Sequence, residues 1–134
     1  MRLITSLIAA VALASGASAA TSTIQQRADA RMAKLLEGRV AGKPVDCIGL
    51  RSIKSTEIVD GTAIVYRGLG DTIYVNQTDD PRGLDRDDIL VSKPWGSHMC
   101  NLDLVRLLDS STRFTRGTVS LRKFIPYTRV THRG

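Results

Sequence analysis

The chain has 134 residues, of which 19 are Lys or Arg and 13 are Asp or Glu, so its formal net charge is +6. This length is enough for one domain with a modest hydrophobic core. After the N-terminal segment, no apolar run approaches the ~20 residues that a membrane-spanning helix needs, which argues against an integral membrane protein.

The first residues have the pattern of a secretory signal peptide. Arg2 supplies a positive charge, and residues 3–14 form a mostly apolar run too short to span the ~30 Å hydrocarbon core. Ala17-Ser18-Ala19 fits the A-x-A pattern that signal peptidase accepts. An ordinary N-terminal helix is the alternative. We predict a signal peptide over residues 1–19, cleaved after Ala19 or alternatively after Ala17 or Ala20, and an exported, soluble, periplasmic protein.

The segment after this site predicts an amphipathic helix that ends near Gly38. Thr23 or Ser22 is a suitable N-cap, with Gln26 in the capping-box position. Apolar residues recur at helical spacing at Ile24, Ala28, Met32, Leu35 and Leu36. This stripe is expected to dock on its own domain, or alternatively on a partner helix. Residues 40–44 are expected to be a linker, so that residues 20–44 form an N-terminal helix and linker.

From Val45 onward the hydrophobic pattern changes to that of β-strands. Residues 55–59, 62–67 and 72–77 are strand-like, and Asp60-Gly61 is a strong hairpin signal. These three strands predict an antiparallel meander. Three shorter predictions follow along the chain: a polar loop at 78–88, a strand at 89–92 and a turn at 94–97.

The last third of the chain is less uniform. Residues 99–108 alternate at first, which would place Cys100, Leu102 and Leu104 on one face, but the Leu-rich end fits a strand or a helix. Residues 117–125 predict a last strand that Pro126 ends. The expected fold class is mainly β (α+β by content). It is a small antiparallel meander or partial barrel over residues 45–126, with an N-terminal helix and a basic tail over 127–134.

Two cysteines, Cys47 and Cys100, are the clearest chemical signal. In an exported protein they predict one disulfide, which would close a loop of roughly fifty residues. The alternative is a metal site in the stretch SHMCN, residues 97–101. In an extended segment His98 and Cys100 share one face, which gives two ligands where structural zinc needs four. These two residues are therefore only weak metal candidates, and no cofactor is expected.

The sequence contains only weak signals for catalysis and for calcium binding. His98 and Asp103 are the one nearby His–Asp combination after Ser97, and no G-x-S-x-G motif accompanies it. We therefore expect no enzyme. The aspartates within residues 79–88 lack the ligand order of a calcium loop, which favours a solvated loop closed by Asx-turns.

Nucleic-acid binding is a further candidate. Tyr66, Tyr74 and Trp95 are suited to stacking on bases from a β surface, but the aromatic content is only 4% and the chain has an export signal. These aromatic residues are more simply core or rim residues, so no nucleic-acid partner is expected.

The C-terminal end is basic. From Arg113 onward there is no acidic residue and there are six basic ones: Arg113, Arg116, Arg122, Lys123, Arg129 and Arg133. Such a charge distribution attracts anionic polymers. A solvated basic face is the favoured interpretation, and anion binding is the weaker one.

The order of short motifs across the chain resembles a known family. The motifs are C-I at 47–48, I-x-S-T-E-I-V-D-G-T at 53–62, Y-V-N at 74–76, G-L at 83–84, M-C-N-L-D-L-V at 99–105 and L-R-K-F-I-P-Y at 121–127. Together they resemble a family of small exported proteobacterial proteins known as a domain of unknown function. The resemblance implies an envelope location and a cysteine-stapled fold, and it implies no catalytic residues. Family members carry further cysteines near the positions of Arg82 and Ser120, where this chain has none.

These features together predict a non-catalytic accessory protein of the bacterial envelope. Its partner would be an envelope protein or an anionic envelope polymer. The alternative is a periplasmic module that binds a small molecule or a metal on the concave face of its sheet.

Overall fold

The computed structural model describes residues 16–131 of the chain. In these residues helix α1 (Gly16–Leu36) precedes ten strands and three short 3-10 helices, η1 (Leu50–Ser52), η2 (Leu69–Asp71) and η3 (Pro81–Gly83). The strands are β1 (Arg39–Ala41), β2 (Cys47–Gly49), β3 (Ile53–Val59), β4 (Ala63–Gly68), β5 (Ile73–Asn76), β6 (Asp88–Ser92), β7 (His98–Cys100), β8 (Leu104–Asp109), β9 (Thr115–Ser120) and β10 (Ile125–Arg129).

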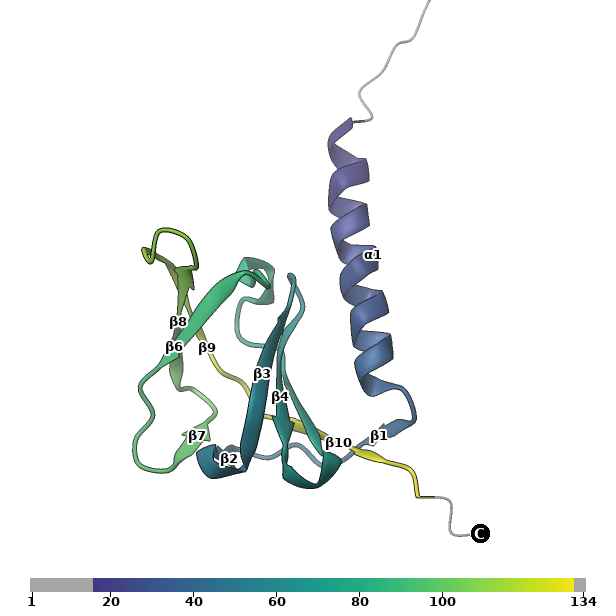
Figure 1. Ribbon diagram of the computed structural model, residues 1–134, viewed down its shortest axis with the longest axis vertical. Coiled ribbons are helices and arrows are strands. Elements are labelled where there is room, and N and C mark those ends of the chain that lie inside the picture. The colour runs from purple at the N-terminus through teal and green to yellow at the C-terminus, as the bar shows by residue number, and fades with distance from the viewer. Residues whose placement is uncertain (1–15, 132–134) are drawn as a thin grey trace, which may run out of the picture.

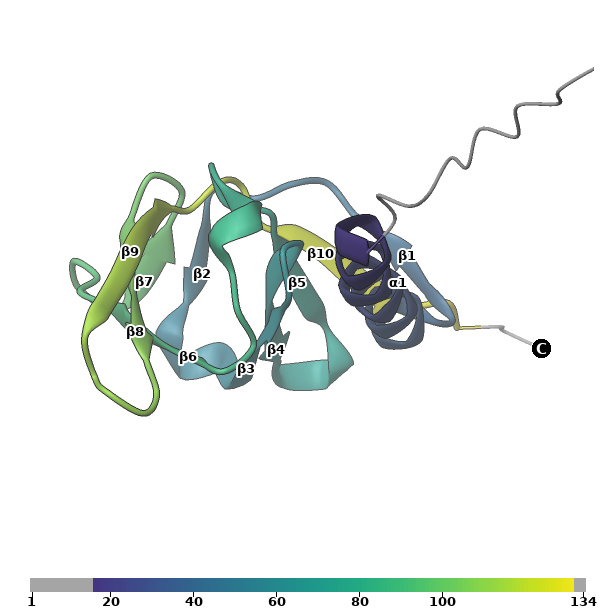
Figure 2. The same ribbon diagram turned by 90° about the horizontal axis from the view of Figure 1, so that it is seen from above.

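All strand pairings are antiparallel, and they build three sheets. The five-stranded sheet has the order β1-β10-β5-β4-β3, the three-stranded sheet has the order β6-β8-β9, and β2 pairs with β7 in a two-stranded ribbon. Helix α1 lies on one side of the five-stranded sheet and the three-stranded sheet on the other (Figures 1 and 2). The fold is mainly β with an N-terminal helix, as predicted, and the sheets do not close into a barrel.

Strand β4 is buried on both faces, and so the fold has two apolar cores. Between the sheets lie Ile48, Ile58, Ile64, Tyr66, Leu84, Met99, Val105, Leu107, Val119, Leu121 and Phe124. Between α1 and the five-stranded sheet lie Ala28, Leu35, Val59, Ala63, Val65, Ile73 and Val75. The second core confirms that α1 docks on its own domain.

The predicted meander is confirmed as β3, β4 and β5, joined by a turn at Asp60-Gly61 and by η2. The Leu-rich end of the later segment is strand β8, not a helix. Leu102 has a left-handed φ of 72° and the chain turns there. The predicted common face of Cys100, Leu102 and Leu104 is therefore wrong, and both leucines are exposed.

The N-terminal boundary of α1 also differs from the prediction. Ser22 and Thr23 lie inside the helix, so the predicted N-cap at Thr23 or Ser22 is wrong. Gly38, with a left-handed φ of 68°, follows the helix as predicted. Residues 1–15 of the predicted signal peptide lie outside the described residues.

Contrary to the linker and tail predictions, residues 39–41 and 125–129 form paired strands. Val40 of β1 lies opposite Thr128 of β10. Pro126 lies inside β10 and does not end the last strand. Proline lacks a backbone N–H but keeps its carbonyl, which here accepts a hydrogen bond from the backbone N–H of Gly42 at 2.6 Å. Residues 132–134 of the predicted tail are outside the described part of the chain.

A buried amide holds the segment that crosses from β9 to β10. Asn76 is fully buried, and its Nδ2 donates to the carbonyl of Arg122 at 2.6 Å. Its Oδ1 accepts from the backbone N–H of Arg122 at 3.0 Å and of Thr78 at 3.1 Å. The held segment carries Leu121 and Phe124, both fully buried between the sheets. Asn76 thus adds side-chain hydrogen bonds to a segment whose backbone pairing is limited to single contacts such as the Val45–Phe124 bridge.

The predicted disulfide is present. Cys47 of β2 and Cys100 of β7 are directly opposite in the ribbon and are bonded, with a sequence separation of 53. The next pair along the ribbon, Ile48 and Met99, is buried in the core between the sheets. The crosslink therefore secures a ribbon whose inner face is part of that core.

Removal of the disulfide should strongly destabilise the protein. For the Cys47→Ala/Cys100→Ala double variant we expect a loss of about 4 kcal/mol in the free energy of unfolding, because the crosslink closes a long loop in the unfolded chain. Urea denaturation measures this loss. Reductant should lower the midpoint of the wild-type chain and leave that of the variant unchanged. Equal midpoints for the variant and the oxidised wild type would contradict the prediction.

The Asn76→Leu variant tests the crossing segment. We expect a loss of about 3 kcal/mol in unfolding free energy, because the backbone groups of Arg122 and Thr78 lose buried hydrogen bonds. Urea denaturation is again the measurement. Gln77→Leu is the matched control, since Gln77 is the exposed neighbouring amide and its loss should change stability by under about 0.5 kcal/mol. Equal losses in the two variants would argue against this role for Asn76.

Candidate functional site

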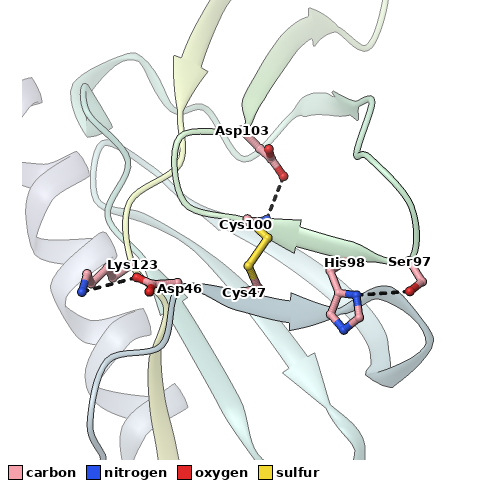
Figure 3. The surroundings of a disulfide bond; sticks show 7 residues. All are labelled: Asp46, Cys47, Ser97, His98, Cys100, Asp103 and Lys123. Carbon is pink, nitrogen blue, oxygen red and sulfur yellow. Dashed lines mark hydrogen bonds and ion pairs between the residues drawn. A yellow bond between two sulfur atoms is a disulfide. The ribbon is translucent and has the colours of Figure 1, made fainter.

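The stretch around Cys100 does not assemble a metal or catalytic centre. His98 is exposed, with its Nδ1 at 3.1 Å from Oγ of Ser97, while Oδ2 of Asp103 accepts the backbone N–H of Cys100 at 2.7 Å (Figure 3). His98 and Asp103, the His–Asp combination noted in the sequence, therefore have different hydrogen-bond partners. The sulfur of Cys100 is bonded to Cys47, and no group of three or more His, Cys, Asp or Glu side chains among the described residues is arranged to hold a metal ion.

The aspartates of the 79–88 loop hold the loop itself. Oδ1 of Asp85 accepts the backbone N–H of Asp87 at 2.9 Å, which is the expected Asx-turn. Asp79 exchanges two hydrogen bonds with the backbone of Ser120, at 2.9 and 2.7 Å. These contacts give the aspartates structural roles.

The predicted basic residues are spread over the C-terminal third. Three of them form ion pairs from different segments: Arg116 with Asp88 at 2.6 Å, Lys123 with Asp46 at 3.3 Å and Arg129 with Asp71 at 2.5 Å. Arg113 lies in the turn between β8 and β9, Arg122 lies in the crossing segment, and Arg133 lies outside the described residues. The three ion-paired residues therefore have acidic partners in three different segments.

Two of the three aromatic residues considered for base stacking belong to the core, because Tyr74 is partly buried against it and lies opposite Tyr66. Tyr66 is buried, 5.6 Å from Phe124 in an edge-on arrangement. Trp95 lies in the turn before β7 and is 93% exposed. A stacking platform is therefore not formed by these side chains.

A groove of about 780 Å³ lies beside strand β3. Its walls come from α1, from β3 and from the segment that leads into β6. The walls include Arg27, Arg31, Thr56, Glu57, Asp87 and Leu90, and the base includes Tyr66, Met99 and Val105. The rim is charged and the base is largely apolar, which is the usual composition of a binding site.

The groove is bordered by two strand edges that are unpaired among the described residues. β3 pairs only with β4, and β6 pairs only with β8. Near one end, Gly61 donates to the carbonyl of Leu84 at 2.9 Å; near the other end, Leu50 donates to the carbonyl of Ser97 at 2.9 Å. Between these two ties the edges of β3 and β6 keep free backbone donors and acceptors.

Tyr66 brings an unpartnered hydroxyl to this groove. The residue is only 2% exposed, yet its phenol group has no hydrogen bond to any described residue. Burial also raises the pKa of the phenol above its ordinary value, so the group stays protonated. Because the oxygen is not among the buried unpartnered atoms, it reaches the open space of the groove and is a candidate ligand contact.

An ion pair fixes α1 beside the groove. Nε of Arg31 donates to Oε1 of Glu57 at 2.5 Å and Nη2 donates to Oε2 at 2.8 Å, while Arg67 lies 3.7 Å from the same carboxylate. The hydrogen bonds from Arg31 lower the pKa of Glu57, against the opposing effect of burial. The bidentate contact therefore sets the width of the groove between α1 and β3.

Sequence reasoning missed the groove residues, because they come from separate segments that show no common pattern.

Comparison of the chain with protein-family models, with curated proteins and with solved structures finds no match in any of the three. Among the described residues, no helix is both long and apolar enough to cross a membrane. The function is therefore argued from geometry.

The Glu57→Gln variant tests the ion pair. We expect a loss of up to about 1 kcal/mol in unfolding free energy at pH 7, because both partners are partly exposed. Since the pKa of Glu57 is lowered in the folded state, this contribution is present above the ~4.3 of an unfolded glutamate and disappears as the pH falls through the folded-state value.

The measurement is urea denaturation at pH 7 and at pH 3, where the difference between wild type and variant should shrink. Glu37→Gln is the matched control, because Glu37 lies exposed just after α1 and forms no ion pair with the described residues. A difference that grows on acidification would contradict the assignment.

Proposed function

We propose that this chain is an exported, non-catalytic binding protein of the bacterial envelope and that it holds its partner in the groove beside β3. The observation that carries the proposal is the unpartnered hydroxyl of Tyr66 at the base of a groove between two free strand edges. The hydroxyl is open to the groove, because it is not among the buried unpartnered atoms. It therefore offers a bound partner a hydrogen bond at the apolar base.

Two features support export. Residues 1–19 have the charge, apolar run and small-residue end of a signal peptide. Cys47 and Cys100 form a disulfide, and structural disulfides persist in oxidising compartments such as the periplasm. The resemblance to small exported proteobacterial proteins points the same way.

Three of the groove carboxylates already serve the fold: Glu57 holds Arg31, Asp88 holds Arg116, and Asp60 accepts the backbone N–H of Arg86 at 2.7 Å. Asp87 lies on the rim with no His, Cys or second carboxylate arranged with it as a metal-binding group among the described residues. A general acid or base acts together with a nucleophile or a second positioned group. An envelope protein is the favoured partner over an anionic envelope polymer, because the base of the groove is apolar and the basic residues are dispersed.

A periplasmic small-molecule carrier is the second candidate. The volume of about 780 Å³ favours it, since ligand pockets commonly enclose about 300–1,000 Å³. A carrier would retain a stoichiometric small molecule through purification.

Intact-mass spectrometry of the chain, expressed with its own N-terminus and purified from the periplasmic fraction, tests the proposal. We expect a chain that begins at Ala20, carries no small molecule under native conditions and gains the mass of two hydrogen atoms on reduction. The Ala19→Arg variant is the control, because a large charged side chain at the cleavage site should block processing. A full-length chain retained in the cytoplasm with free thiols would overturn export, and a retained small molecule would favour the carrier.

A further inference from the structure

We infer that the partner enters the groove as an extended polypeptide segment, which adds as a strand along the free edge of β3. This inference rests on the proposed function and names its partner class. The segment would have alternating apolar and polar side chains, with the apolar ones directed at the base of the groove. One of its polar groups would hydrogen-bond to the hydroxyl of Tyr66.

The edge of β3 is long, and Lys54 and a pairing irregularity lie at its start. At the opposite edge of the same sheet, β1 has only three residues, whereas β3 has seven. Proteins usually blunt exposed edges with charges, prolines, bulges or very short strands. The pairing of β3 has an irregularity between Ile53 and Ser55, but beyond it Ser55 and Thr56 are small, uncharged and exposed. The edge from Ser55 onward therefore remains open to a further strand.

The opposite wall also offers backbone groups. The end of β3 lies beside the segment that precedes β6, since Arg86 donates to Asp60, and the segment before β3 lies beside Ser97, which follows β6. The two strands therefore run in opposite directions along the groove. A strand between them would be antiparallel to one and parallel to the other, and both arrangements form regular hydrogen-bond ladders. A polypeptide can use both walls in this way, whereas a small molecule has no such repeat.

The side chains of the groove select an alternating sequence. The inner face of β3 presents Thr56 and Ile58 beside Tyr66, Met99 and Val105, so every second residue of an added strand meets apolar surface. The other residues would face the rim, where Arg27 and Asp87 have side chains with no ion pair among the described residues. The charged rim favours polar residues at those positions.

The test is selection of binders from a displayed library of random linear peptides, with the full chain purified from the periplasm as bait. We expect enrichment of alternating apolar and polar sequences. Calorimetry with the enriched peptides should show binding that is at least roughly tenfold weaker to the Thr56→Trp variant, because the indole fills the groove. Ser55→Trp is the matched control: Ser55 is the exposed neighbour on the opposite face of β3 and does not line the groove. The Ser55→Trp variant should bind the enriched peptides with the same affinity as the wild type.

Two further measurements separate strand addition from other binding. Tyr66→Phe should weaken the enriched peptides by roughly fivefold, which corresponds to one hydrogen bond. Peptides N-methylated at alternate backbone amides keep their side chains but lose donors on one edge. N-methylation of either the odd-numbered or the even-numbered amides, or of both, should abolish binding. Circular dichroism and thermal unfolding establish that each variant is folded.

Three outcomes would overturn the inference: no peptides enriched over the Thr56→Trp variant, enriched peptides that bind both variants equally, or binding that survives both sets of N-methylation. Failure of the proposed function gives a different result, namely an unprocessed chain with free thiols or a turnover that His98→Ala abolishes. A chain that is exported and disulfide-bonded but selects no peptides would therefore remove strand addition alone.

Discussion

Strand β4 must be kept from water on both of its faces, and the layered architecture follows from that constraint. Ala63 and Val65 point toward α1, while Ile64 and Tyr66 point toward the three-stranded sheet, and all four are buried. Apolar burial contributes about 25 cal/mol for each Å² removed from water, so neither cover is dispensable. The helix and the three-stranded sheet are therefore both needed to bury β4.

The second cover depends on a segment with little regular structure. Between β9 and β10 the chain delivers Leu121 and Phe124 to the core, although its backbone has left the strand ladder. Side chains from β5 and the loop after it supplement the few backbone contacts, because Asn76 and Asp79 hydrogen-bond to the backbone on both sides of Leu121. The segment thus buries two apolar side chains while its backbone polar groups keep hydrogen-bond partners.

Features with a clear signature in the sequence were predicted correctly. Asp60-Gly61 marked the central hairpin, and two cysteines in a chain with a signal-peptide pattern marked the disulfide. Strands β1 and β10 were missed because three- and five-residue strands carry no clear period, and because Pro126 is tolerated only where its neighbours need no N–H from it. The groove has no local signature at all, since α1, β3, β4, β6, β7 and β8 each contribute only a few of its residues.

The disulfide and the groove are parts of one structure. Met99, which lines the base of the groove, is next to Cys100 in β7 and lies opposite Ile48 in the ribbon that the disulfide closes. Oxidation therefore does more than restrict the unfolded chain: it fixes the backbone that presents Met99 beneath the free edge of β3. Glu57 and Arg31 fix the opposite wall by holding α1 against the same strand. A groove set by a crosslink on one side and an ion pair on the other is preorganised, and preorganisation lowers the entropic cost of binding an extended segment.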